Sequence, residues 1–416
     1  MKYFNWLKPG IYIKRWIFAG GIGIILVIAG VYPCFYRFID WGNAFFHVVA
    51  LFAGIALIIF SVRKAVKSLF LIFGISNFTE LLQYKIYEKH YLDKGCRIVV
   101  IGGGTGLSVI LRGFKKVTSN ITAIVTTMDD GGGSGVLRED LGMLPPGDIR
   151  SCILALADTE EDMQELFQYR FKEGRLSGQS FGNLLIAALT GVYDNFEEAV
   201  TKVHEILAVK GRVLPVTAED VKLCAELENG EKITGESQIP LSVMESKSRI
   251  RRVSLEPSNP KPIEETISAI KDADIIVFGP GSLYTSIIPN FLVKGIIEAL
   301  SKSKAKKVFI TNIMTQPGET DGYSVLDHLK AVDQHIGRKI IDCILVNNER
   351  ISADNLIKYK DDGAKPVYLN KKESRKLKRE GIKIIEGAFV DEKQGYIRHD
   401  ADRIADVIKE LASKQK

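Results

Sequence analysis

The sequence predicts an α/β protein with a mainly parallel β-sheet covered by helices on both faces, preceded by an N-terminal two-helix transmembrane hairpin. Two observations lead to this prediction. Two long uncharged runs stand near the N-terminus, and from residue 97 onward short runs rich in Val and Ile alternate with stretches of helical spacing. Buried parallel strands have near-continuous apolar sequences, because helices cover both of their faces.

The two N-terminal runs are each long enough to cross a membrane. Residues 16–36 and residues 41–62 contain 21 and 22 positions without a charged side chain, and about 20 apolar residues span the hydrocarbon layer as a helix. The alternative is a buried helical hairpin in a soluble protein. Basic residues flank the pair on its outer sides: Lys2, Lys8, Lys14, Arg15, Arg63, Lys64 and Lys67. The positive-inside rule therefore predicts a multi-pass protein of the cell membrane, with two spans in lipid and with both termini and the main domain cytoplasmic.

The chain divides into three predicted parts. Residues 1–67 form the transmembrane hairpin, residues 68–95 have the amphipathic pattern of a linker helix, and residues 96–416 form the main domain. Strands are expected at residues 97–101, 121–126, 275–278, 307–310 and 340–346. Residues 213–252 differ, because short alternating runs and turn residues predict a small β-rich insertion there.

Charge and composition exclude several classes of function. Residues 1–95 carry 11 Lys and Arg against 4 Asp and Glu, whereas the other 321 residues carry 45 against 46. A nearly neutral main domain lacks the basic surface of a nucleic-acid-binding protein. The five cysteines and six histidines are scattered without metal-ligand spacing. We therefore expect no zinc site, no haem and no flavin, and the sequence contains no P-loop, GxSxG or HExxH motif.

A glycine-rich loop follows the first predicted strand. It comprises Gly102, Gly103, Gly104, Thr105 and Gly106, and a stretch of helical spacing comes next. Glycines let a backbone approach an oxygen-rich group closely, and a helix start offers unpaired N–H groups with a positive dipole end. The large side chain that follows this loop departs from the dinucleotide fingerprint, which argues against NAD. A tight turn without a ligand is the alternative.

A second loop brings carboxylates beside glycines. Asp129 and Asp130 follow the second predicted strand and precede a glycine run that contains Ser134. Such a pair could hold Mg²⁺ with a diphosphate, or supply a catalytic base. An acidic turn with Ser134 as a helix cap is the alternative.

Further polar loops occur at helix starts or directly after strands. Their candidate ligand-binding residues are Asp148, Arg150, Ser180, Asn183, Gly281, Ser282, Asn312 and Thr315. Loops that follow the strands of a parallel sheet meet at its carboxyl edge, where such sheets bind ligands. We therefore expect one polar site at that edge.

The ordered set of motifs resembles the YvcK/CofD-like family, also called gluconeogenesis factors, from residue 97 to the C-terminus. The motifs are Gly102-Gly-Gly-Thr-Gly-Leu107, Asp129-Asp-Gly-Gly132, Pro145-Pro-Gly-Asp-Ile-Arg150, Gly182-Asn183, Gly235-Glu-Ser237, Gly279-Pro-Gly-Ser-Leu-Tyr-Thr-Ser286 and Thr315-Gln-Pro-Gly-Glu-Thr320. The resemblance implies a Rossmann-like fold. One branch of the family is 2-phospho-L-lactate transferase, which uses a nucleotide-activated donor, a deazaflavin acceptor and Mg²⁺. The other branch, to which this chain is more similar, comprises regulators of carbon flow and cell-envelope synthesis that bind UDP-sugars.

For the regulatory branch, the resemblance implies that Tyr359 and the Arg398-His399 pair bind the UDP-sugar, with UDP-N-acetylglucosamine as the expected ligand. An aromatic ring can stack on a base and an arginine can clamp a diphosphate. The resemblance also implies an enzyme of amino-sugar or envelope-precursor synthesis as a protein partner, and it leaves a homo-oligomer open.

The rival interpretation is a Mg²⁺-dependent transferase of a phosphorylated group, with Asp129 and Asp130 as metal ligands or catalytic residues. Three departures from the family pattern weigh against a shared reaction. Gly133 and Val136 stand where the family usually has a serine and an arginine, and Gln179 stands where it usually has a histidine.

Overall fold

The computed structural model of the 416-residue chain describes residues 13–36, 41–72, 91–159, 161–360, 362–393 and 396–414. The chain divides into two compact units, residues 1–89 and residues 90–416. The second unit is called the body below.

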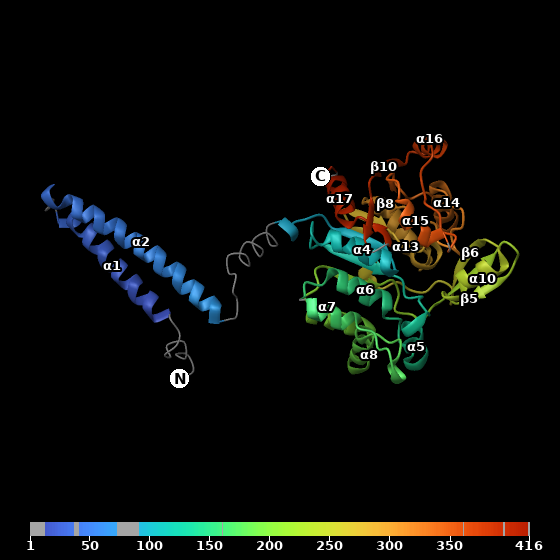
Figure 1. Cartoon of the computed structure of the whole chain (residues 1–416), viewed down its shortest axis with the longest axis horizontal. Helices are drawn as coiled ribbons and strands as arrows, with labels where there is room; N and C mark the ends of the chain where they lie inside the picture. The colour runs from blue at the N-terminus through green and yellow to red at the C-terminus, as the bar shows by residue number, and fades with distance from the viewer. Residues whose placement is uncertain are drawn as a thin grey trace. The chain divides into compact units, whose positions relative to one another are not determined.

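Two long helices form the described part of the first unit, α1 (Ile13–Tyr36) and α2 (Trp41–Ile72) (Figure 1). Both contain a stretch that is long and apolar enough to span a membrane, Lys14–Tyr32 with mean hydropathy 1.8 and Ala44–Ser68 with mean hydropathy 2.5. The helices approach closely at Gly54, where an added Cβ would lie 2.6 Å from the carbonyl oxygen of Gly23. Small residues allow such contact between apolar helices. Most of the predicted linker helix falls on residues 73–90, which lie outside the described residues.

A seven-stranded parallel sheet forms the centre of the body. Its strands are β1 (Ile98–Gly102), β2 (Ile121–Val125), β3 (Arg212–Pro215), β7 (Ile275–Phe278), β8 (Lys306–Ile310), β9 (Cys343–Asn347) and β10 (Lys383–Gly387). Their order is β10-β9-β8-β7-β1-β2-β3, and every neighbouring pair is parallel. The strand order reverses between β1 and β7, and open α/β sheets bind ligands beyond the carboxyl ends of the strands at such a switch point.

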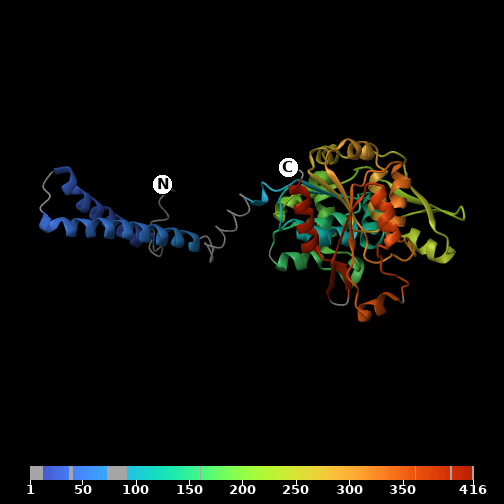
Figure 2. The same ribbon diagram turned by 90° about the horizontal axis from the view of Figure 1, so that it is seen from above.

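Helices cover both faces of the sheet, as Figures 1 and 2 show. In β1, Ile98 and Val100 belong to one hydrophobic core, whereas Val99 and Ile101 belong to the other. Successive side chains of a strand point to opposite faces, so a continuous apolar run builds two cores at once. The predicted Rossmann-like fold class is therefore confirmed.

The helices divide between these two cores. The core that includes Ile98 contains residues of α4 (Gly104–Phe114), α6 (Gly147–Leu156), α7 (Glu161–Gln168), α8 (Phe181–Tyr193), α9 (Phe196–Ile206) and α17 (Ala401–Ser413). The core that includes Val99 contains residues of α11 (Glu264–Asp272), α12 (Ile288–Phe291), α13 (Ile296–Lys302), α14 (Val325–Ile336) and α16 (Lys371–Arg379). The first core also contains Leu137 of α5 (Gly132–Leu141), and the second contains Leu283, Tyr284 and Ile287 of the buried π-helical turn η4 (Leu283–Ile287). The remaining elements are the short helix η3 (Gly174–Leu176), α15 (Ala353–Lys360), β11 (Val390–Lys393) and β12 (Tyr396–His399).

A small β-rich insertion follows β3. It contains β4 (Lys222–Leu227), β5 (Lys232–Thr234), α10 (Gln238–Ser246) and β6 (Ile250–Glu256), and its antiparallel strands have the order β5-β4-β6. The predicted insertion began at residue 213, but Val213 pairs with Ala123 of β2 and belongs to the main sheet. A buried strand followed by alternating strands has no compositional break, so only the pairing separates them.

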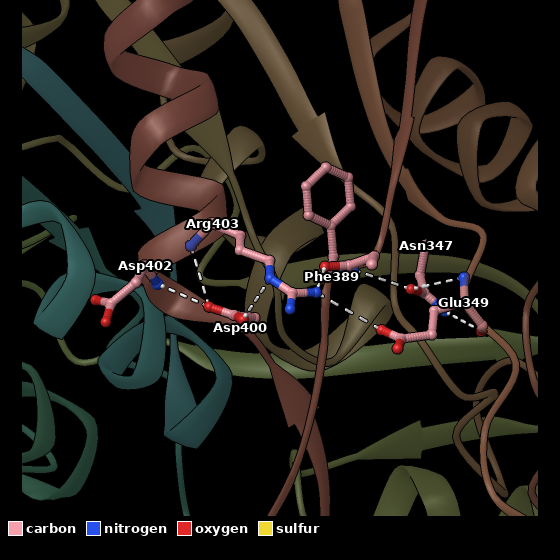
Figure 3. Close-up of polar contacts among 7 residues, drawn as sticks. Asn347, Glu349, Phe389, Asp400, Asp402 and Arg403 are labelled. Atoms are coloured by element: carbon pink, nitrogen blue, oxygen red, sulfur yellow. Dashed lines mark hydrogen bonds and ion pairs between the residues drawn. The ribbon is translucent and has the colours of Figure 1, made fainter.

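Polar contacts near the C-terminus fix the segment between β10 and β11 (Figure 3). The guanidinium of Arg403 lies 3.1 Å from a carboxylate oxygen of Asp400 and 3.8 Å from one of Glu349. The N–H of Phe389 donates to the side-chain oxygen of Asn347 at 3.1 Å. These contacts tie the start of the β11–β12 hairpin to the carboxyl end of β9.

Candidate functional site

A cavity of about 340 Å³ opens at the carboxyl edge of the sheet, where the strand order reverses. It is lined by Gly103, Gly104, Thr105, Gly106, Thr126, Asp129, Asp148, Glu236, Gly281, Ser282, Thr285 and Ser286. These residues come from the loops after β1, β2 and β7, from the start of α6 and from the insertion. We refer to it as the carboxylate cavity.

The glycine turn after β1 forms one wall of the carboxylate cavity. A Cβ on Gly103 would lie 2.6 Å from a carboxylate oxygen of Asp148, and one on Gly106 would lie 2.7 Å from the carbonyl oxygen of Pro280. Gly104 has φ +69°, a conformation that favours glycine. The N-cap residue of α4 is Gly103, so no side chain caps the N–H groups at the start of this helix. The turn therefore brings backbone N–H groups close to the cavity without intervening side chains.

Three carboxyl groups face this space. Burial and the neighbouring Asp129 raise the pKa of Asp148 to about 7, and the same two causes raise the pKa of Glu236 to about 8. Burial also raises the pKa of Asp129, although the N–H of Gly131 donates to its carboxylate at 2.9 Å and opposes the shift. The described lining contains no Lys or Arg, so the cavity has an acidic and poorly compensated interior.

Asp130 does not line the carboxylate cavity, although it is adjacent in sequence to Asp129. Its two carboxylate oxygens accept the N–H groups of Glu236 at 3.0 Å and of Ser237 at 2.8 Å. Asp130 therefore fixes the segment between β5 and α10, and this segment carries Glu236 into the cavity wall.

Glu319 supports the opposite wall. Its side chain is 4% exposed, and its carboxyl group accepts the N–H of Tyr284 at 3.1 Å and the hydroxyl of Thr285 at 3.2 Å. The Glu236 carboxyl shares the Thr285 hydroxyl. The loop after β8 thus holds the loop after β7 in position.

A second cavity, of about 290 Å³, also borders the first turn of α4. It is lined by Thr105, Gly106, Val109, Tyr359, Tyr396, Ile397, Arg398 and His399, and we call it the aromatic groove. The guanidinium of Arg398 lies 5.5 Å from the centroid of the Tyr396 ring. The hydroxyl of Tyr359 accepts the N–H of Ile397 at 3.0 Å. The two cavities share Thr105 and Gly106.

His399 holds the aromatic groove to the sheet. Its Nε2 lies 3.0 Å from the carbonyl oxygen of Thr311, and burial lowers its pKa to about 4. The ring is therefore neutral at physiological pH, and Nε2 carries the proton that it donates to the carbonyl. This contact places β12 beside the end of β8.

Comparison with known proteins identifies the family. The family model for 2-phospho-L-lactate transferase CofD matches residues 98–390. The chain belongs to the YvcK/CofD-like family. The predicted resemblance is confirmed. The match covers the sheet, the insertion and every residue that lines the carboxylate cavity, but it ends before Tyr396, Ile397, Arg398 and His399 of the aromatic groove.

Individual members of this family are similar to the chain at high identity. A gluconeogenesis-factor relative from Clostridium acetobutylicum is 48% identical over 429 residues, which cover 100% of this chain and 93% of the relative. The gluconeogenesis factor of Bacillus subtilis is 48% identical over 316 residues, which cover 76% of this chain and 98% of that protein. The crystal structure of a UPF0052 family member from Bacillus halodurans has a TM-score of 0.71 at 47% identity and covers 75% of this chain and 98% of that chain.

Several of the predicted site residues lie outside the lining of both cavities. Ser134 hydrogen-bonds Asp129, and the carbonyl of Gly102 accepts the N–H of Thr126 at 3.0 Å. Asn312 donates from its side-chain nitrogen to the carbonyl of Gly281 at 3.0 Å. The hydroxyl of Thr315 accepts the N–H of Lys365 at 2.8 Å. These groups position the loops that line the carboxylate cavity.

Arg150, Ser180 and Asn183 meet at the start of α8. The guanidinium of Arg150 donates to the hydroxyl of Ser180, and this hydroxyl accepts the N–H of Asn183 at 3.3 Å. Burial lowers the pKa of Arg150. The group connects α6 to α8 and lines neither cavity.

Seven lining residues were not predicted as site residues: Val109, Thr126, Glu236, Thr285, Ser286, Tyr396 and Ile397. A sequence signal existed for some of them, because Glu236, Thr285 and Ser286 belong to family motifs. Tyr396 and Ile397 had no such signal.

Proposed function

We propose that this chain is a membrane-anchored regulator that binds a nucleotide sugar, UDP-N-acetylglucosamine in particular, and links carbon metabolism to cell-envelope synthesis and cell shape. One observation carries the proposal. Thr105 and Gly106 of the glycine turn line both an aromatic, arginine-bearing groove and a cavity rich in hydrogen-bond acceptors. A nucleotide sugar has the matching order, with an aromatic base, a diphosphate and a polyhydroxylated ring.

The diphosphate belongs at the glycine turn and the aromatic groove. Backbone N–H groups at a helix start attract anions, and the guanidinium of Arg398 can make charge-assisted hydrogen bonds to phosphate. Tyr359 and Tyr396 offer rings for contact with the base. Phosphates placed in the carboxylate cavity would instead face Asp129, Asp148 and Glu236 without a basic neighbour.

The N-terminal helices support the membrane part of the proposal. Two apolar helices of sufficient length, with basic residues outside both runs, favour two spans with both termini and the body in the cytoplasm. Related proteins named gluconeogenesis factors support a role in carbon metabolism. We further propose that the regulated partner is an enzyme of amino-sugar or envelope-precursor synthesis, and that the chain acts as a homo-oligomer.

Calorimetry of the full-length protein in detergent micelles tests the binding proposal. Arg398→Ala should weaken UDP-N-acetylglucosamine binding by ~1.5–3 kcal/mol, since it removes a charge-assisted bond. Arg375→Ala, on the exposed face of α16, is the matched control and should leave the affinity unchanged. Equal affinities in wild type and Arg398→Ala would remove the aromatic groove from the site.

The family match keeps a Mg²⁺-dependent transferase as a second candidate. The described residues contain no group of three or more His, Cys, Asp or Glu side chains placed to hold a metal. Mg²⁺ commonly binds one or two carboxylates together with substrate phosphates, and Asp129 with Asp148 fits that mode. Transfer from a nucleotide-activated donor by wild type, lost in Asp129→Asn, would favour this candidate. UDP-sugar binding without Mg²⁺ and without transfer would favour the regulator.

A further inference from the structure

The carboxylate cavity differs in chemistry from the glycine turn and the aromatic groove that it adjoins. Its polar side chains are carboxyl groups and hydroxyls, and no aromatic or basic side chain stands in its described lining. A bare cation site is not favoured, since no set of three metal-ligating side chains is found among the described residues. The surroundings suit a neutral ligand that donates several hydrogen bonds.

We propose that the carboxylate cavity binds the sugar ring of the nucleotide sugar through ring hydroxyls that donate to Asp129, Asp148 and Glu236, and that it excludes sugars bearing a carboxylate. This inference rests on the proposed function, and it assigns the direction in which the ligand lies. The base end occupies the aromatic groove, the diphosphate crosses Thr105 and Gly106, and the sugar enters the carboxylate cavity.

The lining residues that the two cavities share support this direction. Thr105 and Gly106 line both of them, so a diphosphate at the first turn of α4 has one end facing each cavity. The cavity volumes, about 340 Å³ and about 290 Å³, lie near the lower end of the range of ligand pockets, roughly 300–1,000 Å³. Each volume therefore suits one part of the ligand rather than the whole of it.

The hydrogen-bonding groups and rings that line each cavity decide which part of the ligand enters it. Sugar hydroxyls can donate to the carbonyl oxygen of a protonated carboxyl group and to either oxygen of an ionised one. A uracil ring gains most from stacking, and the described aromatic rings stand only on the groove side, at Tyr359 and Tyr396. Reversing the ligand would place its base among carboxyl groups and its sugar against two tyrosines.

Hydrogen bonds from the backbone to Asp130 fix the wall that carries Glu236. Asp130 accepts two successive N–H groups of that segment, and a Cβ on Gly235, whose φ is +109°, would lie 2.8 Å from the Asp130 carboxylate. Glu236 is thus held at a fixed place between the cavity and Thr285. A sugar carboxylate entering here would lose water in a partly buried space that has no basic side chain. Above the raised pKa values of Asp148 and Glu236, their carboxylates would also repel it.

The test compares UDP, UDP-N-acetylglucosamine and UDP-glucuronate on the full-length protein in micelles at about pH 9, above the raised pKa values of Asp148 and Glu236. In wild type, UDP-N-acetylglucosamine should bind at least tenfold more tightly than UDP, and UDP-glucuronate should bind no more tightly than UDP. Glu236→Gln should reduce the preference for UDP-N-acetylglucosamine over UDP by fivefold or more, and it should strengthen UDP-glucuronate binding relative to wild type. Arg398→Ala should weaken UDP and UDP-N-acetylglucosamine equally.

Controls separate the possible failures. Glu245→Gln, exposed on α10 of the same insertion, should change none of the three affinities. Asp148→Asn provides a second variant if Glu236→Gln does not fold. If Glu236→Gln and Asp148→Asn shift UDP and UDP-N-acetylglucosamine by the same factor, the sugar does not occupy the carboxylate cavity although the proposed function stands. If wild type binds no UDP-sugar, the proposed function itself fails and this inference falls with it.

Discussion

Replacing Glu236 with glutamine should change how the stability of the body depends on pH. The pKa of Glu236 is raised from 4.5 to about 8 in the folded protein. Between these values the folded state keeps a proton that the unfolded state releases, so the free energy of unfolding falls as pH rises. Each pKa unit corresponds to about 1.4 kcal/mol. From about pH 5 to about pH 8, the free energy of unfolding of wild type should therefore fall by roughly 2–4 kcal/mol because of Glu236. Glu236→Gln should not show this decrease.

Urea unfolding at several pH values measures this difference. Residues 90–416 form one compact unit, and a solved relative consists almost wholly of the matching region, so this fragment suits the assay. The glutamine is nearly isosteric, and Glu245→Gln serves as the exposed control. Wild type and Glu236→Gln should have similar stability near pH 5 and diverge toward pH 8, with the variant more stable. Parallel pH curves would show that Glu236 is not held protonated by its surroundings.

Three other predictions concern the turn, the groove and the topology. Gly106→Ala should lower the free energy of unfolding by about 1–3 kcal/mol and weaken nucleotide binding, because its Cβ would lie 2.7 Å from the carbonyl oxygen of Pro280. Thermal unfolding measures the first effect and calorimetry the second. The control is Gly191→Ala, whose Cβ would meet nothing within 4 Å. Tyr359→Phe should keep most of the UDP-sugar affinity, whereas Tyr359→Ala should lose ~0.5–1.5 kcal/mol of binding free energy, since the ring makes the stacking contact. Equal losses of binding free energy in the two variants would assign the effect to the hydrogen bond between the Tyr359 hydroxyl and the N–H of Ile397. Reporter fusions at residue 416 should place the C-terminus in the cytoplasm, and a periplasmic or external reporter would contradict both the topology and a cytoplasmic ligand.

Local patterns predicted the strands and the glycine turn correctly. Val and Ile runs specify buried parallel strands wherever they pair, and five of the seven strands of the main sheet were expected within a few residues of their observed bounds. The glycine turn was recognisable for the same reason, because a strand, a glycine run and a helical pattern are consecutive in sequence. The long apolar runs predicted α1 and α2, since length and the absence of charge suffice for that prediction.

Tertiary structure alone decided how the site is assembled. Asp129 and Asp130 are equivalent by sequence, yet the chain turns between them, so that one faces the carboxylate cavity and the other binds the backbone of the insertion. Glu236 joins the site because that insertion folds back over the edge of the sheet. Tyr359 and Arg398 were expected in the site only from the family resemblance, and they reach Thr105 through contacts between segments distant in sequence. Periodicity and motif spacing describe neighbours along the chain, whereas these contacts depend on strand order and on the packing of loops at one edge of the sheet.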